Sequence, residues 1–146
     1  MRVLVSACLL GENCKYNGLS NRSQAVIGFL RDKEAVPVCP ELLGGLGVPR
    51  PCVELRAGRA VTRDGQDLDA AIRRGVELAL EAAGDIDLAV LQSRSPTCGA
   101  RQIYDGTFSG QLIPGMGLLA AALQAQGVPL ADAGELAAES GAGHAL

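Results

Sequence analysis

Three short apolar runs, separated by longer stretches, constrain most strongly how this chain can fold. They are Arg2 to Ala7, Ala35 to Val38 and Leu88 to Leu91. Between the second and third runs, apolar residues recur at helical spacing from Asp67, a candidate N-cap, to Gly84. Runs that alternate with helices indicate parallel strands joined by right-handed crossovers. The sequence therefore predicts an α/β fold: a three-layer sandwich with a small, mostly parallel, Rossmann-like sheet.

The remaining segments predict shorter elements around this sheet. We expect helices at about 23–33 and 117–126, an edge strand at 128–130, a long loop over 92–116, and a hairpin over 53–62 that turns at Ala57-Gly58. Residues 1–133 then form a single α/β domain. Residues 134–146, which are rich in Ala, Gly and Glu without periodicity, are expected to form a flexible C-terminal tail.

Composition excludes several classes of protein. Of 146 residues, 48% are hydrophobic and 20% are charged, which is typical of one globular domain. The net charge of -3, with no basic run, argues against duplex nucleic acid as a partner. No apolar stretch reaches the roughly 20 residues of a membrane-spanning helix, and the N-terminus does not resemble a signal peptide. We expect a cytoplasmic protein, and nothing in the sequence indicates an oligomeric state.

Cysteine is over-represented beside a single histidine, His144, in the predicted tail. The five cysteines are Cys8, Cys14, Cys39, Cys52 and Cys98. In a reducing compartment an odd number of thiols favours metal binding or catalysis over a disulfide framework. Cys8, Cys39 and Cys98 each follow a predicted strand, and ligands of open parallel sheets bind at the carboxyl ends of strands. These three thiols are therefore expected to converge on one crevice.

Four interpretations of the convergent thiols are open. Buried cysteines often have a purely structural role, but these three lie beside turn residues and not within apolar runs. A zinc site normally takes four ligands in close pairs, and the chain has no CxxC pair. Nucleophilic catalysis needs a basic partner, and the predicted domain has no histidine. An iron-sulfur cluster takes thiolates by preference, and the residues alone place it modestly ahead of zinc.

Five motifs carry a resemblance to a known family. In chain order they are Ser6-Ala7-Cys8-Leu9-Leu10-Gly11, Cys39-Pro40-Glu41, Gly44-Gly45-Leu46 with Pro49-Arg50, Ser95-Pro96-Thr97-Cys98-Gly99, and Ile103-Tyr104-Asp105-Gly106-Thr107-Phe108. Together they resemble the bacterial family long described as a domain of unknown function, which includes the 2-thiouracil desulfurases. The resemblance spans about residues 2 to 130.

The resemblance implies a 4Fe-4S cluster on Cys8, Cys39 and Cys98, with the sulfur of a small thiolated substrate bound at the fourth iron. It also implies that Glu41 and Ser95 assist catalysis. The expected activity is that of an iron-sulfur-dependent desulfidase acting on a substrate such as 2-thiouracil. The alternative is a non-catalytic iron-sulfur or zinc module for sensing, storage or electron transfer. An exposed cluster is oxygen-labile, so aerobic preparation is expected to remove it.

Further residues are assigned from their place in the predicted loops. Asn13, Arg50 and Tyr104 are expected to line the substrate pocket. The chain departs from the family pattern at two positions, where Gln92 replaces a frequent Lys and Thr97 replaces a common Ser. These departures bear on the choice of natural substrate, which the sequence does not identify. Cys14 and Cys52 are extra to the three-cysteine pattern. We interpret them as bystanders, and the alternatives are that they are sulfur acceptors or alternative ligands in the apo protein.

Overall fold

A parallel sheet of four strands organises the molecule, which a computed structural model describes over residues 1–137. The strand order is β2-β1-β5-β8. The strands are β1 (Arg2–Ser6), β2 (Glu34–Val38), β5 (Leu88–Leu91) and β8 (Leu130–Asp132). All three pairings are parallel, with Val3 of β1 opposite both Ala35 of β2 and Leu88 of β5. β1 and β5 are interior strands, and their central residues are fully buried, as expected when helices cover both faces.

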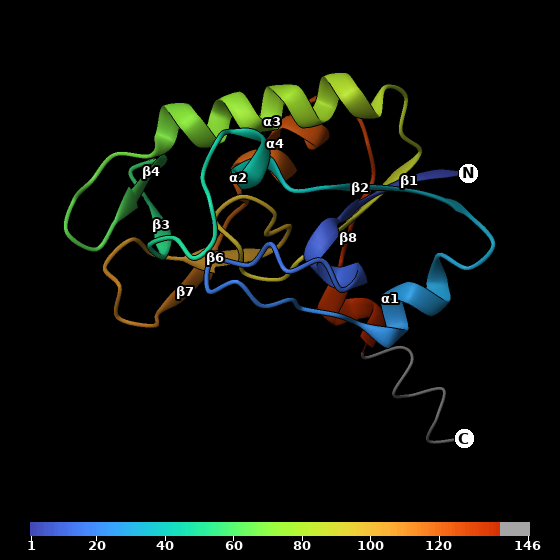
Figure 1. Cartoon of the computed structure of the whole chain (residues 1–146), viewed down its shortest axis with the longest axis horizontal. Helices are drawn as coiled ribbons and strands as arrows, with labels where there is room; N and C mark the ends of the chain where they lie inside the picture. Colours follow the sequence, from blue (N-terminus) through green and yellow to red (C-terminus); the bar gives the residue numbers. More distant parts are fainter. Residues whose placement is uncertain (138–146) are drawn as a thin grey trace.

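Helices cover the two faces of the sheet and make it the middle of three layers (Figure 1). On one face, α3 (Asp69–Ala83) and α4 (Leu118–Ala125) pack against Leu4 and Leu91. On the other face, α1 (Gln24–Phe29) and the helical residues 133–137 pack against Val3, Val5 and Val90. Alternate strand residues thus serve opposite cores, which confirms the predicted α/β three-layer class.

Smaller elements sit at the carboxyl edge of the sheet. β1 runs into a 3-10 turn, η1 (Ala7–Leu10), and β2 runs into the short helix α2 (Pro40–Leu43). Two antiparallel hairpins follow: β3 (Val53–Arg56) with β4 (Arg59–Thr62), and β6 (Gln102–Tyr104) with β7 (Leu112–Pro114). These elements are on the side where the predicted site lies.

Close backbone contact holds α2 against α3. A Cβ atom added at Gly75 of α3 would lie 1.7 Å from the carbonyl oxygen of Pro40, and one added at Gly44 would lie 2.1 Å from that of Ala71. Such distances are far below van der Waals contact, so both positions require glycine. The two glycines let α2 lie directly on α3. Because α2 begins at Pro40, this contact also positions the Cys39-Pro40-Glu41 motif.

The predicted elements are mostly found, with local differences. The hairpin turn has Ala57 and Gly58 at positive φ, as a type I′ turn requires. α1 ends at Phe29 and not near residue 33, and the Lys33 ammonium donates to the free carbonyl oxygen of Phe29 at 2.9 Å. β8 starts two residues later than predicted, and the β6–β7 hairpin lies in the stretch predicted as a loop.

The predicted flexible tail is only partly covered. Residues 133–137 are helical and Ala133 is buried in the core, whereas residues 138–146, including His144, lie outside the described residues. The tail therefore stays a prediction. Within residues 1–137, no helix combines the length and the apolar character needed to cross a bilayer.

Candidate functional site

A cavity of about 570 Å³ opens at the carboxyl edge of the sheet. Its walls come from the loops after β1, β2 and β5 and from both hairpins. Four of the five cysteines lie in these loops, and the fifth, Cys52, is exposed at the wall next to β3. The side chains that line the cavity include Cys8, Cys14, Asn21, Cys39, Glu41, Arg50, Cys52, Glu54, Gln92, Ser95, Cys98, Tyr104 and Phe108. The predicted crevice is thus a real cavity.

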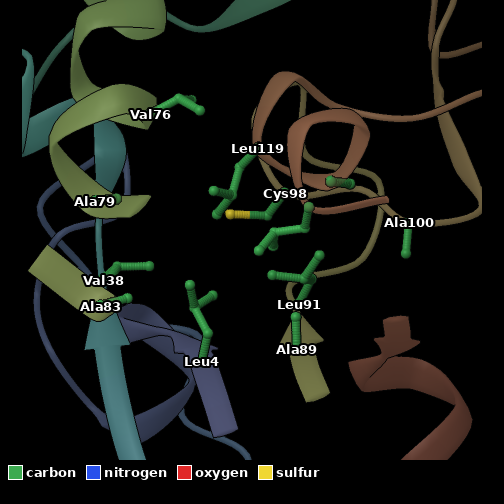
Figure 2. Close-up of a cluster of buried hydrophobic side chains, with 12 residues drawn as sticks. Leu4, Val38, Val76, Ala79, Ala83, Ala89, Leu91, Cys98, Ala100 and Leu119 are labelled. Atoms are coloured by element: carbon green, nitrogen blue, oxygen red, sulfur yellow. The ribbon is translucent and has the colours of Figure 1, made fainter. Parts of the chain in front are cut away.

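The three predicted ligands come from three different strand ends. Cys8 lies in η1 directly after β1, and Cys39 is the residue that precedes the first turn of α2. Cys98 lies in the loop after β5, where its side chain is buried. Figure 2 shows its sulfur among core side chains that include Leu91 and Leu119. The topology therefore brings thiols separated by up to 90 residues to one cavity, as the strand-end argument predicted.

Cys14 lies between two of these thiols. Its hydrogen bonds to Cys8 and Cys39 raise its own pKa and hold it as the thiol donor. The hydrogen bond from Cys14 lowers the pKa of Cys8 to about 7, against partial burial, and the Asn21 amide donates to the same sulfur at 3.5 Å. The hydrogen bond from Cys14 is also the main cause that lowers the pKa of Cys39. The pKa values of two predicted ligands are thus lowered toward the thiolate form, which is the form that binds metal.

Cys98 lies deeper than the other thiols. Burial raises the pKa of Cys98, a hydrogen bond with Ser6 opposes this, and the nearby charges of Glu41, Cys8 and Cys39 raise it further. Cys98 lines the same cavity as Cys8 and Cys39. A metal centre would supply the positive charge that stabilises this buried group as a thiolate.

Glu41 projects from α2 into the cavity and is paired with a buried arginine. The Arg50 guanidinium donates to Glu41 Oε2 and, at 2.8 Å, to the carbonyl oxygen of Cys14. The Arg50 side chain is only 6% exposed, whereas that of Glu41 is 20% exposed. The Arg50 backbone N–H also donates to the carbonyl of Tyr16 at 2.7 Å. Arg50 therefore links α2 to the loop that carries Cys14. Most of its guanidinium hydrogen-bonding capacity is used within the protein.

Ser95 organises the loop that carries Cys98. Its Oγ accepts the backbone N–H of Thr97 at 3.1 Å and that of Cys98 at 3.0 Å. Both acceptor sites of the hydroxyl are then used, and its proton remains available for donation. Ser95 lines the cavity, so this donor is next to the predicted ligands.

Of the other two predicted pocket residues, one lines the cavity and one does not. Tyr104, in β6, lines the cavity, but Asn13 is exposed and is not among the lining residues. The asparagine that lines it is Asn21, which bonds to Cys8. Its position in the loop after Cys8 could have suggested it. Gln92 lines the cavity as well, whereas Thr97 is fully buried.

Sequence reasoning missed one buried carboxylate. Glu54, in β3, is 8% exposed and lines the cavity. The available signal was a charged residue between Val53 and Leu55 in a strand, because charged side chains are rarely buried without a partner.

The chemistry of the lining thiols suits an iron-sulfur cluster. Cys8, Cys39 and Cys98 are soft ligands from three separate elements. Within residues 1–137, no three His, Cys, Asp or Glu side chains are arranged to hold a single metal ion. A cubane takes each thiolate on a different iron atom, so its ligands need not meet at one point. The donor set fits such a group.

Fold and site define a parallel α/β protein with a thiol-rich cavity at its strand ends. The family model for 2-thiouracil desulfurase matches residues 3–135. The solved structure of the [4Fe-4S]-dependent thiouracil desulfidase TudS is similar with a TM-score of 0.85 and 36% identity, covering 99% of each chain. The uncharacterized protein YbbK of Bacillus subtilis (strain 168) is 37% identical over 146 residues, covering 92% of this chain and 97% of YbbK.

The chain belongs to the 2-thiouracil desulfurase family. This confirms the resemblance found in the five motifs and the prediction that the protein is an enzyme of the desulfurase type.

Proposed function

We propose that this protein removes sulfur from a small thiolated heterocycle of the 2-thiouracil type, using a 4Fe-4S cluster bound by Cys8, Cys39 and Cys98. The observation that carries the proposal is that these thiols, from three strand ends, line one cavity together with Glu41 and Ser95. Family membership and the likeness to TudS, a [4Fe-4S]-dependent thiouracil desulfidase, support the same cofactor here.

The reaction replaces the thiocarbonyl sulfur by the oxygen of water and releases sulfide. When bound, the cluster supplies an open iron that acts as a Lewis acid on the carbon–sulfur bond. Water adds to the carbon, one of its protons is taken up, and the carbon–sulfur bond breaks as the carbonyl forms. No oxidant or reductant is needed, because sulfur leaves at the oxidation level at which it arrived.

Glu41 is the proposed general acid and base. Its Oε2 is bound by Arg50, and within the described residues its Oε1 has no hydrogen-bond partner. That oxygen can accept a proton from the attacking water and return it to the departing sulfur. Ser95 is the proposed donor that orients the water or the substrate, because its hydroxyl proton is not used by the fold. Tyr104, which lines the cavity, completes the proposed substrate contacts.

The direct test is anaerobic reconstitution followed by assay of uracil and sulfide formed from 2-thiouracil. We expect one sulfide for each uracil. Glu41→Gln should lose activity by about 100-fold or more with iron content unchanged, since general acid–base catalysis contributes about 10² to 10⁴ in rate. The exposed Cys52→Ser variant is the control and should resemble the wild type. An intact cluster that desulfurates no thiolated base would contradict the proposal.

One observation favours a second candidate, a non-catalytic iron-sulfur module. The Cys14 thiol is in contact with Cys8 and Cys39, so it could close the fourth coordination position. Cys14→Ser distinguishes the two functions. A desulfidase keeps its cluster and activity in this variant, whereas a four-ligand module loses or weakens its cluster. Metal analysis of anaerobically purified protein decides between iron and zinc.

A further inference from the structure

The wall of the cavity formed by the two hairpins carries a buried carboxylate that the proposed reaction does not use. Glu54 is more than nine-tenths buried, in β3, and lines the cavity. No cation pairs with it within residues 1–137. Burying a carboxylate without satisfying its oxygens costs free energy, so the partners of each oxygen have to be accounted for.

One oxygen of Glu54 is saturated by the protein. Oε1 accepts the backbone N–H of Gly106 at 3.0 Å and that of Phe108 at 3.1 Å. The Arg56 guanidinium donates to the Gly106 carbonyl at 2.8 and 3.0 Å from the same strand. A Cβ atom at Gly106 would lie 2.7 Å from the Leu55 carbonyl, so the loop lies tightly on β3. These contacts fix the orientation of the carboxylate.

The other oxygen of Glu54 has no hydrogen-bond partner in the described part of the chain. Within residues 1–137, Thr97 Oγ1 is the one side-chain oxygen or nitrogen that is fully enclosed and has no partner. Glu54 Oε2 has no partner in this range either, so it must be accessible to solvent. Because Glu54 lines the cavity, the accessible oxygen of this clamped carboxylate is available to a bound molecule. An oriented carboxylate acceptor in a cavity binds a hydrogen-bond donor.

We propose that Glu54 is a substrate-binding residue whose Oε2 accepts a hydrogen bond from a ring N–H of the thiolated heterocycle. The inference rests on the proposed function and adds to it a specificity: the enzyme takes rings that retain this N–H. The flat side chains of Tyr104 and Phe108 line the same cavity, which suits a planar ring. Phe108 is itself held at a φ of 57° by its bond to Glu54.

Glu54→Gln separates binding from structure. Glutamine keeps one oxygen for the N–H groups of Gly106 and Phe108 but places an amide donor where Oε2 was. We expect KM for 2-thiouracil to rise about 10- to 100-fold with kcat nearly unchanged, because a hydrogen bond to a charged group is lost from ground state and transition state alike. Glu77→Gln, at a side chain that is 67% exposed, is the matched control and should leave KM unchanged.

Methylated substrates provide the second arm. For the wild type, either 1-methyl- or 3-methyl-2-thiouracil should show the same 10- to 100-fold rise in KM, according to which N–H is bound. Glu54→Gln should lose this discrimination. Equilibrium binding of 2-thiouracil, measured by calorimetry in the Glu41→Gln background with and without Glu54→Gln, should show the same ratio with turnover suppressed.

Two results would overturn the inference. A wild type that does not distinguish either methylated ring from 2-thiouracil binds no ring N–H, whatever the stability of the variants. If the Glu54→Gln protein folds and keeps the wild-type KM, affinity and discrimination between 2-thiouracil and its methylated forms, Glu54 only stabilises the loop. In both cases the wild type still forms uracil, whereas failure of the proposed function abolishes uracil formation in the wild type itself.

Discussion

Replacing Gly75 with alanine should displace the helix that positions Glu41. The new Cβ atom would lie 1.7 Å from the Pro40 carbonyl oxygen, 2.6 Å from its carbon and 2.9 Å from the Gly44 nitrogen. These are backbone atoms, so no side-chain rotation relieves the overlap. Ordinary contact begins at 3.4 Å, and α2 must therefore retreat from α3 by about 1.7 Å.

The magnitude follows from two opposing effects. Overpacking in a tight interface costs about 1–3 kcal/mol. Alanine in place of glycine inside a helix returns about 1 kcal/mol. The Gly75→Ala variant should lose up to about 2 kcal/mol of unfolding free energy, which lowers Tm by up to about 6 °C for a domain of this size. A shift of about 1 Å in a catalytic group can cost about 10²-fold in rate, so kcat should fall by about that factor.

Thermal unfolding and uracil formation measure the two effects. Gly28→Ala is the matched control, because Gly28 lies in α1 and an added Cβ meets nothing within 4 Å. This variant should have equal or higher Tm and full activity. If Gly75→Ala melts at the wild-type temperature and keeps wild-type kcat, close α2–α3 contact does not position the site and the reasoning is refuted.

Three further substitutions test other contacts of the site. Arg50→Gln should lower kcat at least 10-fold with iron content unchanged, because the donor that orients Glu41 is weakened. Arg50→Lys should recover part of the lost rate. Equal kcat in the wild type and both variants would show that Arg50 does not orient Glu41. Ser95→Ala leaves the N–H groups of Thr97 and Cys98 without their acceptor. It should lower the unfolding free energy by about 1–2 kcal/mol and reduce the amount of iron that the protein retains. Ser95→Thr should restore both. Thr97→Val removes a buried hydroxyl without a partner in the described chain and should raise Tm by a few degrees in a melting experiment; a large drop in Tm would show that the hydroxyl is bonded.

The parallel sheet could be predicted because its signals are local. Leu88–Leu91 is an uninterrupted apolar run and was found with the same bounds, and the Ala57-Gly58 turn was found where its sequence indicated. Once these runs are assigned to one parallel sheet, Cys8 and Cys98 must lie at the same edge, because each follows the carboxyl end of a strand. The three-layer fold and the cavity at the strand ends were therefore accessible from the sequence.

The missed features depend on tertiary contacts. The β6–β7 hairpin has strands of three residues and is held by Glu54 and Arg56 of another hairpin, which no local pattern encodes. α2 is one turn long within a segment rich in Gly and Pro, and Gly75 stabilises its position from the neighbouring helix. Cys14, interpreted as a bystander, hydrogen-bonds with two predicted ligands in a loop that returns to η1, where the Asn21 N–H donates to the Cys8 carbonyl at 3.0 Å.

The structure of the anaerobically reconstituted protein bound to 2-thiouracil tests the central claim most directly. The account predicts a 4Fe-4S cluster with Cys8, Cys39 and Cys98 on three irons. The fourth iron should carry no protein ligand and face the substrate sulfur. A cluster whose fourth iron is bound by Cys14 or Cys52, or a substrate whose sulfur points away from the thiols, would contradict it.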